Sequence, residues 1–269
     1  LMQTQPEVSV RLNPAKDGDS TDVARMAGAS VPWYDGGRYL AERPRFTLDP
    51  QLHQGRYYVQ DASSMVSTAV ARHISALVSA ENRQQQAPVQ QEQISAQEQP
   101  GAAQPRPDDI QPDDIPLLWL DACAAPGGKS IAAIDGLPDG SLVVSNEYDR
   151  QRAEILRENL AKWGYEGSVV TRGDTAQYTA LRDTFDVVAV DAPCSGEGMR
   201  KDETARTQWS PALVEECASR QKEILSNLWD TLRPGGFLVY STCTFNTTEN
   251  EEIVRWLTEE YGAEVLPLP

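Results

Sequence analysis

The sequence has 269 residues, which is enough for one large α/β domain or for one domain with a smaller appendage. Its formal net charge of −16 argues against a uniformly basic nucleic-acid-binding surface. The acidity is concentrated, however. Residues 81–116 hold seven acids and two bases, residues 247–264 hold six acids and one base, and together they supply −10 of the −16. The remainder is only mildly acidic, so nucleic acid is not excluded as a partner.

The composition also indicates the cellular compartment and argues against a bound metal ion. No apolar run reaches the length of a membrane span and no signal peptide is visible, so we expect a cytoplasmic protein with reduced thiols and no membrane partner. The four cysteines (Cys123, Cys194, Cys217 and Cys243) form no C-x-x-C pair and the chain has two histidines, so we predict no metal site. We also expect a monomer.

Residues 1–80 predict a small α+β N-terminal subdomain. Residues 8–12 alternate like a half-buried strand, residues 19–26 suit a short helix, and residues 31–40 suit a strand, a turn and a second strand. Another strand ends near residue 59, and a helix is expected from about 64 to 78. The arginines and aromatic residues between 33 and 46 suit either a clamp for single-stranded nucleic acid or a small core, and residue types alone favour the core.

Residues 81–116 differ in composition from the rest of the chain. They contain ten glutamines, six prolines and no aromatic residue, and therefore too little apolar surface to offset the loss of chain entropy. We predict a disordered insertion rather than a helix.

Residues 117–269 alternate strands with helices, which predicts a parallel sheet. Strands are expected at 117–120, 141–146, 168–171, 185–190 and 237–241, with a further strand beginning at 263–266. Helices are expected at 129–135, 150–163, 211–232 and 248–261. The sequence stops just inside the last of these strands, so we predict that this domain is truncated at its C-terminus.

The first strand runs into a turn of small residues, Asp121 to Gly128, which opens a helix at Lys129. A turn of this kind at the carboxyl end of a parallel strand is the usual position of a nucleotide-type site. A phosphate-binding P-loop is excluded because the position five residues before Gly128 is Cys123, and Gly-x-Gly-x-x-Gly is absent. Asp121 would repel a pyrophosphate but suits a cationic ligand with a free amine. A sulfonium-bearing nucleoside amino acid therefore fits better than a phosphate ester, and the alternative is a turn that merely packs a helix on a strand.

Polar residues and cysteines follow the other strands. Glu147 is placed to accept hydrogen bonds from a ribose diol, and Asp174 to receive an adenine amino group, although each alone suits a surface acid or a helix cap equally well. Cys194 and Cys243 end neighbouring strands in turns where backbone N–H groups can stabilise a thiolate, and two thiols beside a methyl donor suggest covalent catalysis. We expect Cys217 and Cys123 to be structural thiols.

Three segments resemble signature motifs of one family. They are Asp121–Lys129 (DACAAPGGK), Asp191–Gly198 (DAPCSGEG) and Ser241–Thr244 (STCT), and they look like those of RNA cytosine-C5 methyltransferases of the NSUN/RsmB/RsmF type, with the bacterial ribosomal RNA branch favoured. Residues 13–16 and 55–64 resemble the family's N-terminal subdomain, which would face the RNA. The resemblance implies a Rossmann-like class I methyltransferase sheet.

The resemblance also implies the cofactor and the residue roles. S-adenosyl-L-methionine would be the methyl donor and a cytosine in RNA the acceptor, ribosomal RNA first and transfer RNA as the alternative. Cys243 would be the nucleophile, Cys194 would assist release of the product, and Asp191 would contact base and cofactor. The remaining cofactor-binding residues would be Cys123, Ala124, Ala125, Pro126, Gly127, Gly128, Lys129, Glu147 and Asp174.

Two other functional classes are compatible with the sequence. One is a non-catalytic RNA-binding or ribosome-assembly factor that retains the fold, against which the intact Cys194, Cys243 and Asp191 count. The other is a DNA cytosine methyltransferase, which also uses a Pro-Cys thiol but is disfavoured by the Thr-Cys-Thr turn.

Overall fold

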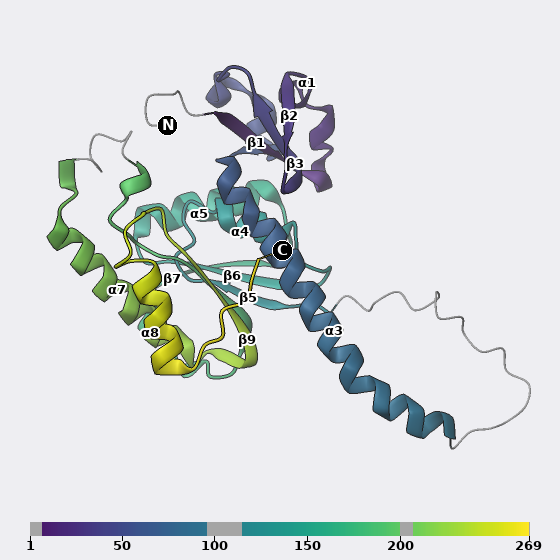
Figure 1. Cartoon of the computed structure of the whole chain (residues 1–269). Helices are drawn as coiled ribbons and strands as arrows, with labels where there is room; N and C mark the ends of the chain where they lie inside the picture. The colour runs from purple at the N-terminus through teal and green to yellow at the C-terminus, as the bar shows by residue number, and fades with distance from the viewer. Residues whose placement is uncertain (1–6, 96–114, 200–206, 269) are drawn as a thin grey trace, which may run out of the picture.

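The computed structural model describes residues 7–95, 115–199 and 207–268, and for residues 83–95 the backbone alone. Within these ranges the chain forms a small antiparallel sheet at the N-terminus and a larger parallel sheet flanked by helices (Figure 1). The predicted α/β fold class with a parallel sheet is confirmed. No helix in the described part of the chain is long and apolar enough to cross a membrane.

The N-terminal sheet has four strands in the order β2-β3-β1-β4. They are β1 (Val8–Leu12), β2 (Ala27–Val31), β3 (Tyr34–Leu40) and β4 (Tyr57–Val59). The short helices are α1 (Asp22–Arg25) and α2 (Pro50–His53), and 3-10 turns lie at Pro14–Lys16, Gly18–Ser20, Phe46–Leu48 and Ala62–Met65. Val10 and Leu12 of β1 pack with Phe46 and Tyr57, and Tyr34 is buried with Val31 and Met65, with Tyr39 packed against them. The predicted aromatic core is therefore confirmed for Tyr34 and Tyr39 but not for Trp33, which is 40% exposed. Ser9 and Arg11 on the other face of β1 are buried as well, so the strand is not half-buried as its alternation predicts.

The parallel sheet has the order β7-β6-β5-β8-β9. Its strands are β5 (Leu118–Asp121), β6 (Leu142–Glu147), β7 (Ser168–Arg172), β8 (Phe185–Asp191) and β9 (Leu232–Ser241), paired in parallel throughout. Consecutive strands β5, β6 and β7 progress in one direction, and β8 then returns to the other side of β5. Open α/β sheets bind ligands at the carboxyl ends of the two strands that flank such a reversal, here β5 and β8, and we call this edge of the sheet the crevice.

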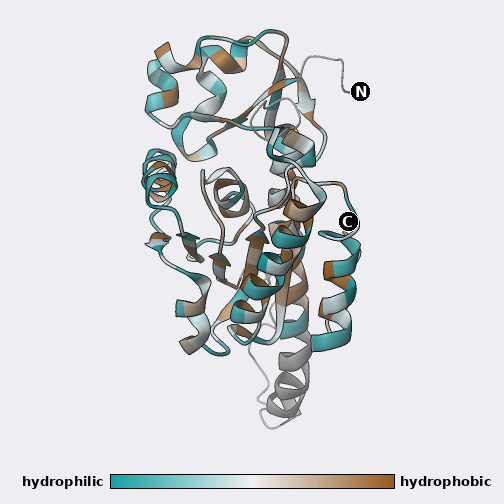
Figure 2. Cartoon of the chain, turned by 90° about the vertical axis from the view of Figure 1, so that its left-hand side faces the viewer, coloured by the Kyte–Doolittle hydropathy of each residue, from teal (hydrophilic) through white to brown (hydrophobic). Residues whose placement is uncertain are grey.

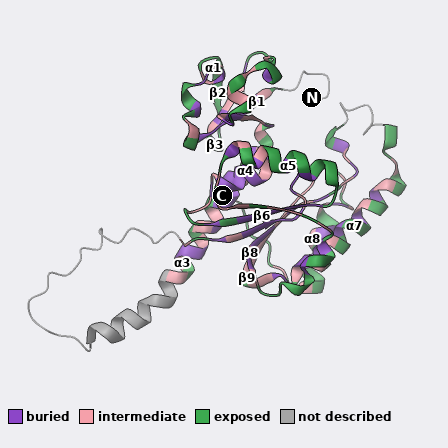
Figure 3. Ribbon diagram, turned by 180° about the vertical axis from the view of Figure 1, so that it is seen from behind, coloured by how far each residue is buried: buried purple, intermediate pink, exposed green. Residues whose placement is uncertain are grey.

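Helices cover both faces of the parallel sheet. The first half of α3 (Val66–Ser95), α4 (Gly128–Ile134) and α5 (Arg150–Trp163) pack on one face, and α7 (Pro211–Trp229) and α8 (Glu251–Tyr261) pack on the other. Short 3-10 turns at Thr175–Ala180 and Glu197–Met199 follow β7 and β8. Hydrophobic residues concentrate in the central strands (Figure 2), and the same strands are the buried layer of the molecule (Figure 3). A parallel sheet buried on both faces explains the apolar runs of β5 and β8.

The N-terminal sheet is fixed to the ends of α4 and α5. The buried guanidinium of Arg11 pairs with Asp135 at the end of α4, N–O distance 2.5 Å. Asn13 Nδ2 donates to the carbonyl of Trp163 at 2.9 Å, which ties the start of the Asn-Pro-Ala-Lys segment to the last turn of α5. Gly55, at φ +69°, lies so close to α5 that a Cβ there would be 1.7 Å from the Lys162 carbonyl. These contacts make the two sheets one packed unit.

Three sequence predictions of secondary structure are wrong. Residues 81–95 continue α3 as a helix, because Gln, Glu, Arg and Ala are good helix formers that extend a helix already nucleated by packing at 66–79, whereas residues 96–114 lie outside the described part. Residues 263–266 form no strand after α8 ends at Tyr261. Residues 232–236 belong to β9 rather than separating it from α7, so the helix ends three residues earlier than predicted.

Candidate active site

The candidate residues gather where the parallel strands end. Asp121, Glu147 and Asp191 are the last residues of β5, β6 and β8, and Asp191 lies beside Ser241, the last residue of β9. Strand register therefore brings the polar ends of four strands to one edge of the sheet, as the alternation of strands and helices predicts.

The turn between β5 and α4 is held from several sides. Ala124 N donates to the carbonyl of Asn146 at 2.8 Å, and Arg152 donates from α5 to the carbonyl of Ala125 at 2.8 Å. Gly127 adopts φ +106°, a conformation that favours glycine, and forms the N-cap of α4. Gln60, just beyond β4, donates to the carbonyl of Gly128 at 2.8 Å, so the N-terminal subdomain supports this turn directly.

Asp121 lies beneath the turn rather than open to a ligand. Its side chain is 3% exposed and accepts a hydrogen bond from Ser130 Oγ at 2.6 Å. Burial raises its pKa to about 6. The Asp121 carboxylate is therefore paired with the Ser130 hydroxyl, and not with the cationic amine of a ligand that the sequence suggests.

Glu147 carries an unsatisfied buried oxygen. Its side chain is 5% exposed, and Oε1 accepts from the backbone N–H of Asp149 at 3.0 Å. Oε2 makes no hydrogen bond with any residue that the structure describes, the closest cation being Arg152 at 3.6 Å. Because buried polar atoms in folded proteins are nearly always paired, an orphaned carboxylate oxygen at a strand end suits a ligand with hydroxyl donors.

A cavity of about 530 Å³ adjoins this position. Its lining includes Asp174 and Gly173 after β7 together with Tyr148, Asp149, Arg150, Arg172 and Gln177. Asp174 caps the following 3-10 turn by accepting from Ala176 N at 2.9 Å, and it also lines the cavity. The helix-cap role and a role toward a ligand are therefore compatible for this residue.

Asp191 and Lys129 form an ion pair in the crevice. Lys129 Nζ lies 2.7 Å from Asp191 Oδ2, and Ser241 Oγ donates to Asp191 Oδ1 at 2.9 Å. Both charged side chains are one-third exposed, so the pair remains accessible from the crevice. The Lys129 ammonium group is therefore paired with Asp191 and does not form part of a phosphate-binding loop.

Cys194 and Cys243 are in direct contact. Their Sγ atoms are 3.0 Å apart, and the backbone N–H of Cys243 donates to Cys194 Sγ at 3.3 Å. The hydrogen bond from the Cys194 thiol lowers the pKa of Cys243 to about 7, helped by the charge of Lys129 and opposed by desolvation and Asp191. The same hydrogen bond, followed by burial, raises the pKa of Cys194. The opposite pKa shifts favour ionisation of Cys243 while Cys194 keeps its proton.

The other two cysteines stand apart from this pair. Burial raises the pKa of Cys123, in the turn after β5, to about 12, and that of Cys217, on α7, to about 11. Neither is poised as a thiolate near neutral pH.

Sequence reasoning missed Glu249, which contacts both cysteine loops, that is, the loop after β8 that carries Cys194 and the loop after β9 that carries Cys243. Glu249 is fully buried and bonds to both loops and to Gln221 of α7. The spacing Asn246-x-x-Glu249 reads as an ordinary capping box before a helix, so it gives no separate signal of contact with Ser195.

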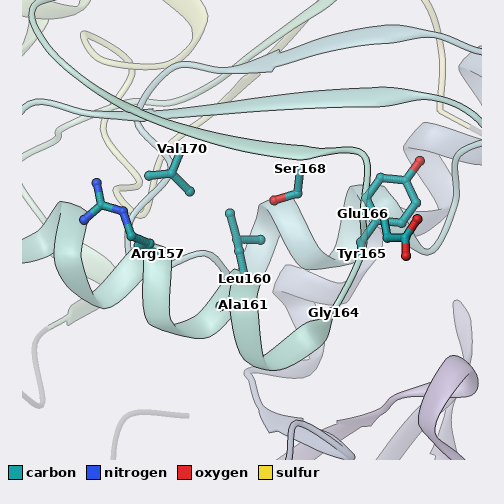
Figure 4. Close-up of a pocket in the computed structure, with 8 residues that line it drawn as sticks. All are labelled: Arg157, Leu160, Ala161, Gly164, Tyr165, Glu166, Ser168 and Val170. Carbon is teal, nitrogen blue, oxygen red and sulfur yellow. The ribbon is translucent and has the colours of Figure 1, made fainter.

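A second cavity lies between α5, the loop that follows it and β7 (Figure 4). It has a volume of about 420 Å³, and its lining residues are Arg157, Leu160, Ala161, Gly164, Tyr165, Glu166, Ser168 and Val170. None of the predicted site residues lines it, and Ser168 is the first residue of β7, at the end of the strand opposite the crevice. It is separate from the candidate site.

Two sequence-family models match the chain. One, described as 16S rRNA methyltransferase RsmB/F, matches residues 109–267, and the other, described as the N-terminal domain of 16S rRNA methyltransferase RsmF, matches residues 1–62.

Curated relatives match over most of the chain. Ribosomal RNA small subunit methyltransferase F from Salmonella heidelberg is 34% identical over 273 residues, covering 97% of this chain and 49% of the relative. The protein of the same name from Erwinia tasmaniensis is 35% identical over 237 residues, covering 86% of this chain and 42% of the relative. The chain therefore spans about half the length of the curated relatives it matches.

Solved structures show the same fold at lower sequence identity. A methyltransferase homolog protein from Pyrococcus horikoshii superimposes with a TM-score of 0.72 at 24% identity, covering 99% of this chain and 74% of that one. NSun6 from Pyrococcus horikoshii, solved with SFG, gives a TM-score of 0.69 at 16% identity, covering 95% and 81%.

Proposed function

Because this chain belongs to the 16S rRNA methyltransferase RsmB/F family, we propose that it methylates C5 of a cytosine in RNA, with S-adenosyl-L-methionine as donor and a covalent Cys243–C6 adduct as intermediate. The family is S-adenosylmethionine-dependent. The proposed substrate is ribosomal RNA, on which the matched relatives act by name, with transfer RNA as the alternative. We propose that the protein acts in the cytoplasm as a monomer. The observation that carries the chemistry is the pair of thiols 3.0 Å apart at the ends of β8 and β9.

The residues at the strand ends fit the cofactor. The Glu147 oxygen that accepts no hydrogen bond suits ribose hydroxyls, and Asp174 lines a cavity large enough for an adenine ring. The turn Cys123–Gly128, with Lys129, completes the proposed cofactor side of the crevice, and Asp191 pairs with Lys129 and is near enough to Cys243 for its charge to raise the pKa of that thiol. When bound, the cofactor supplies an electrophilic methyl group.

The thiol pair supplies what C5 methylation requires. Cytosine C5 is too electron-poor to attack a methyl group unaided. Addition of the Cys243 thiolate to C6 would form the S–C6 bond and move the electron pair of the C5–C6 double bond toward C5. C5 would then form the new C–C bond as the methyl–sulfonium bond of the donor breaks and its electron pair stays on the donor sulfur. Release requires transfer of the C5 proton to a base, return of its electron pair to the double bond and departure of the Cys243 thiolate. Cys194, in contact with the Cys243 sulfur, assists this release.

Separate substitutions of the two cysteines test the proposal. Cys243→Ala should abolish both methylation and any covalent protein–RNA species. Cys194→Ala should attack more slowly at pH 7, because the hydrogen bond that lowers the pKa of Cys243 is lost, but it should still methylate and accumulate an adduct, visible as a denaturation-resistant gel shift. Cys217→Ala is the matched control, since it removes a thiol on α7 outside the contacting pair and should methylate as the parent does.

The readout is mass spectrometry of small-subunit ribosomal RNA and transfer RNA after incubation with labelled S-adenosylmethionine. An adduct lost in Cys194→Ala and trapped in Cys243→Ala would exchange the two roles. Absence of methylation and adduct on both RNAs in every variant would contradict the enzymatic proposal and favour a non-catalytic RNA-binding factor.

A further inference from the structure

A single buried carboxylate lies at the junction of the two cysteine loops. Glu249, in the turn before α8, is fully buried, and its carboxylate accepts four hydrogen bonds. Ser195 donates from both its backbone N–H, at 3.0 Å, and its hydroxyl. The side-chain amides of Asn246 and Gln221 each donate at 2.8 Å.

These donors come from the immediate neighbourhood of the two thiols. Ser195 follows Cys194 directly, and Asn246 is three residues after Cys243. Gln221 anchors the assembly to α7 and also donates to the carbonyl of Pro193 at 3.0 Å. One carboxylate therefore bonds to the loop of each cysteine and to the helix beneath both.

The geometry differs from that of a helix cap. In a capping box the Glu side chain returns to the backbone N–H of the capping residue. Here Asn246 does accept from Glu249 N at 2.9 Å, but the Glu249 carboxylate is directed at the Asn246 side chain and at Ser195, 54 residues earlier in the chain. Since an unpaired buried carboxylate is costly, a cap on the surface would be the cheaper solution if helix initiation were its only role.

We propose that Glu249 is the positioning residue of the thiol pair: its carboxylate holds the Cys194 loop against the Cys243 loop and keeps the two sulfur atoms in contact. The proposal rests on the proposed function only for its consequence in catalysis. The hydrogen bond between the thiols is the largest influence lowering the pKa of Cys243, and a hydrogen bond to sulfur is lost when the two atoms separate by about 1 Å. Loss of the Glu249 contacts should therefore leave Cys243 a less reactive thiol.

The test is the pH dependence of Cys243 alkylation by iodoacetamide, followed by peptide mass spectrometry so that each cysteine is read separately. In the parent chain the midpoint should lie near pH 7. In Glu249→Ala it should move toward the ordinary cysteine value of about 8.5, so that alkylation at pH 7 slows roughly tenfold. Glu251→Gln, an exposed acid two residues further on in the first turn of α8, is the matched control and should keep the parental midpoint.

A folded Glu249→Ala variant with the parental midpoint would overturn the proposal, as would a parental midpoint already at the ordinary value. If circular dichroism shows Glu249→Ala to be unfolded, Glu249→Gln decides. Glu249→Gln keeps the side-chain volume and one acceptor oxygen, but it places an amide group against two of the four donors. The midpoint of Cys243 alkylation should therefore still rise. An unchanged midpoint would again overturn the proposal. Alkylation needs neither RNA nor cofactor, so this outcome is independent of whether the chain proves to methylate cytosine.

Discussion

The ion pair between Arg11 and Asp135 gives the sharpest test of how the two sheets are joined. Arg11, from β1, has a fully buried side chain and is stacked on Tyr34 at 3.7 Å. Its guanidinium donates to Asp135 at 2.5 Å, to Gln60 at 3.0 Å and to Thr68 at 2.8 Å. We predict that Arg11→Met, which keeps much of the side-chain length but removes the charge, strongly destabilises the fold.

The magnitude follows from what remains around Asp135. Removing one partner of a buried ion pair costs about 3–5 kcal/mol, because the other charge is left without its partner. Tyr34 OH at 2.7 Å and Trp163 Nε1 at 3.1 Å still donate to the Asp135 carboxylate, so we expect the lower end, about 3 kcal/mol. For a chain of this size that corresponds to a fall in melting temperature of roughly 6–12 °C.

The loss should depend on pH. Burial already raises the pKa of Asp135, and Arg11 opposes that rise, so Arg11→Met raises it further. A carboxyl whose folded pKa lies above its unfolded value binds protons more tightly when folded, and stability then falls as pH rises between the two values. The difference in unfolding free energy between variant and parent should therefore be smaller at pH 5 than at pH 7.5.

Urea unfolding of both chains at the two pH values measures this difference. Arg25→Met is the control, because Arg25 and Asp22 form an exposed pair and its removal should cost less than about 0.5 kcal/mol. A loss below about 1 kcal/mol for Arg11→Met, or a loss of equal size at both pH values, would refute the view of Asp135 as a buried charge held by Arg11.

Two further predictions concern the crevice. Glu147→Gln should weaken binding of S-adenosylmethionine, measured by calorimetry, by roughly 1–3 kcal/mol, and unchanged affinity would remove Glu147 from the cofactor site. Lys129→Met should move the midpoint of Cys243 alkylation to higher pH and Asp191→Asn should move it to lower pH, because the Lys129 charge lowers and the Asp191 charge raises the pKa of that thiol. Shifts of the same sign in both variants would contradict this electrostatic account.

The sequence predicts the position of the site because strand ends are local features. An apolar run followed by an acid or a cysteine marks the carboxyl end of a buried parallel strand, and parallel strands bring those ends to one edge. Glu147, Asp191 and the strand end preceding Cys243 are therefore located from pattern alone. The family and the fold class follow from the motifs carried by these turns, and both are confirmed.

Contacts between distant segments have no such local signature. The Arg11–Asp135 pair spans 124 residues, and the bond from Glu249 to Ser195 spans 54. Arg11 reads as the polar position of an alternating strand, and Glu249 as a helix cap. Both local patterns are satisfied by a surface side chain, so only the packed fold distinguishes a buried partner from an exposed one.

The same long-range contacts connect the N-terminal sheet to the proposed cofactor site. Gln60 accepts from Arg11 Nε at 3.0 Å and donates to the carbonyl of Gly128 at 2.8 Å, so a single amide links the N-terminal sheet to the turn after β5. A Cβ at Gly128 would lie 3.2 Å from that amide nitrogen, so glycine here permits the close approach. Residues 117–268 on their own would leave the Gly128 carbonyl without this donor and Asp135 without Arg11. The N-terminal subdomain thus supports the turn, and we expect Arg11→Met to weaken S-adenosylmethionine binding as well as to lower stability.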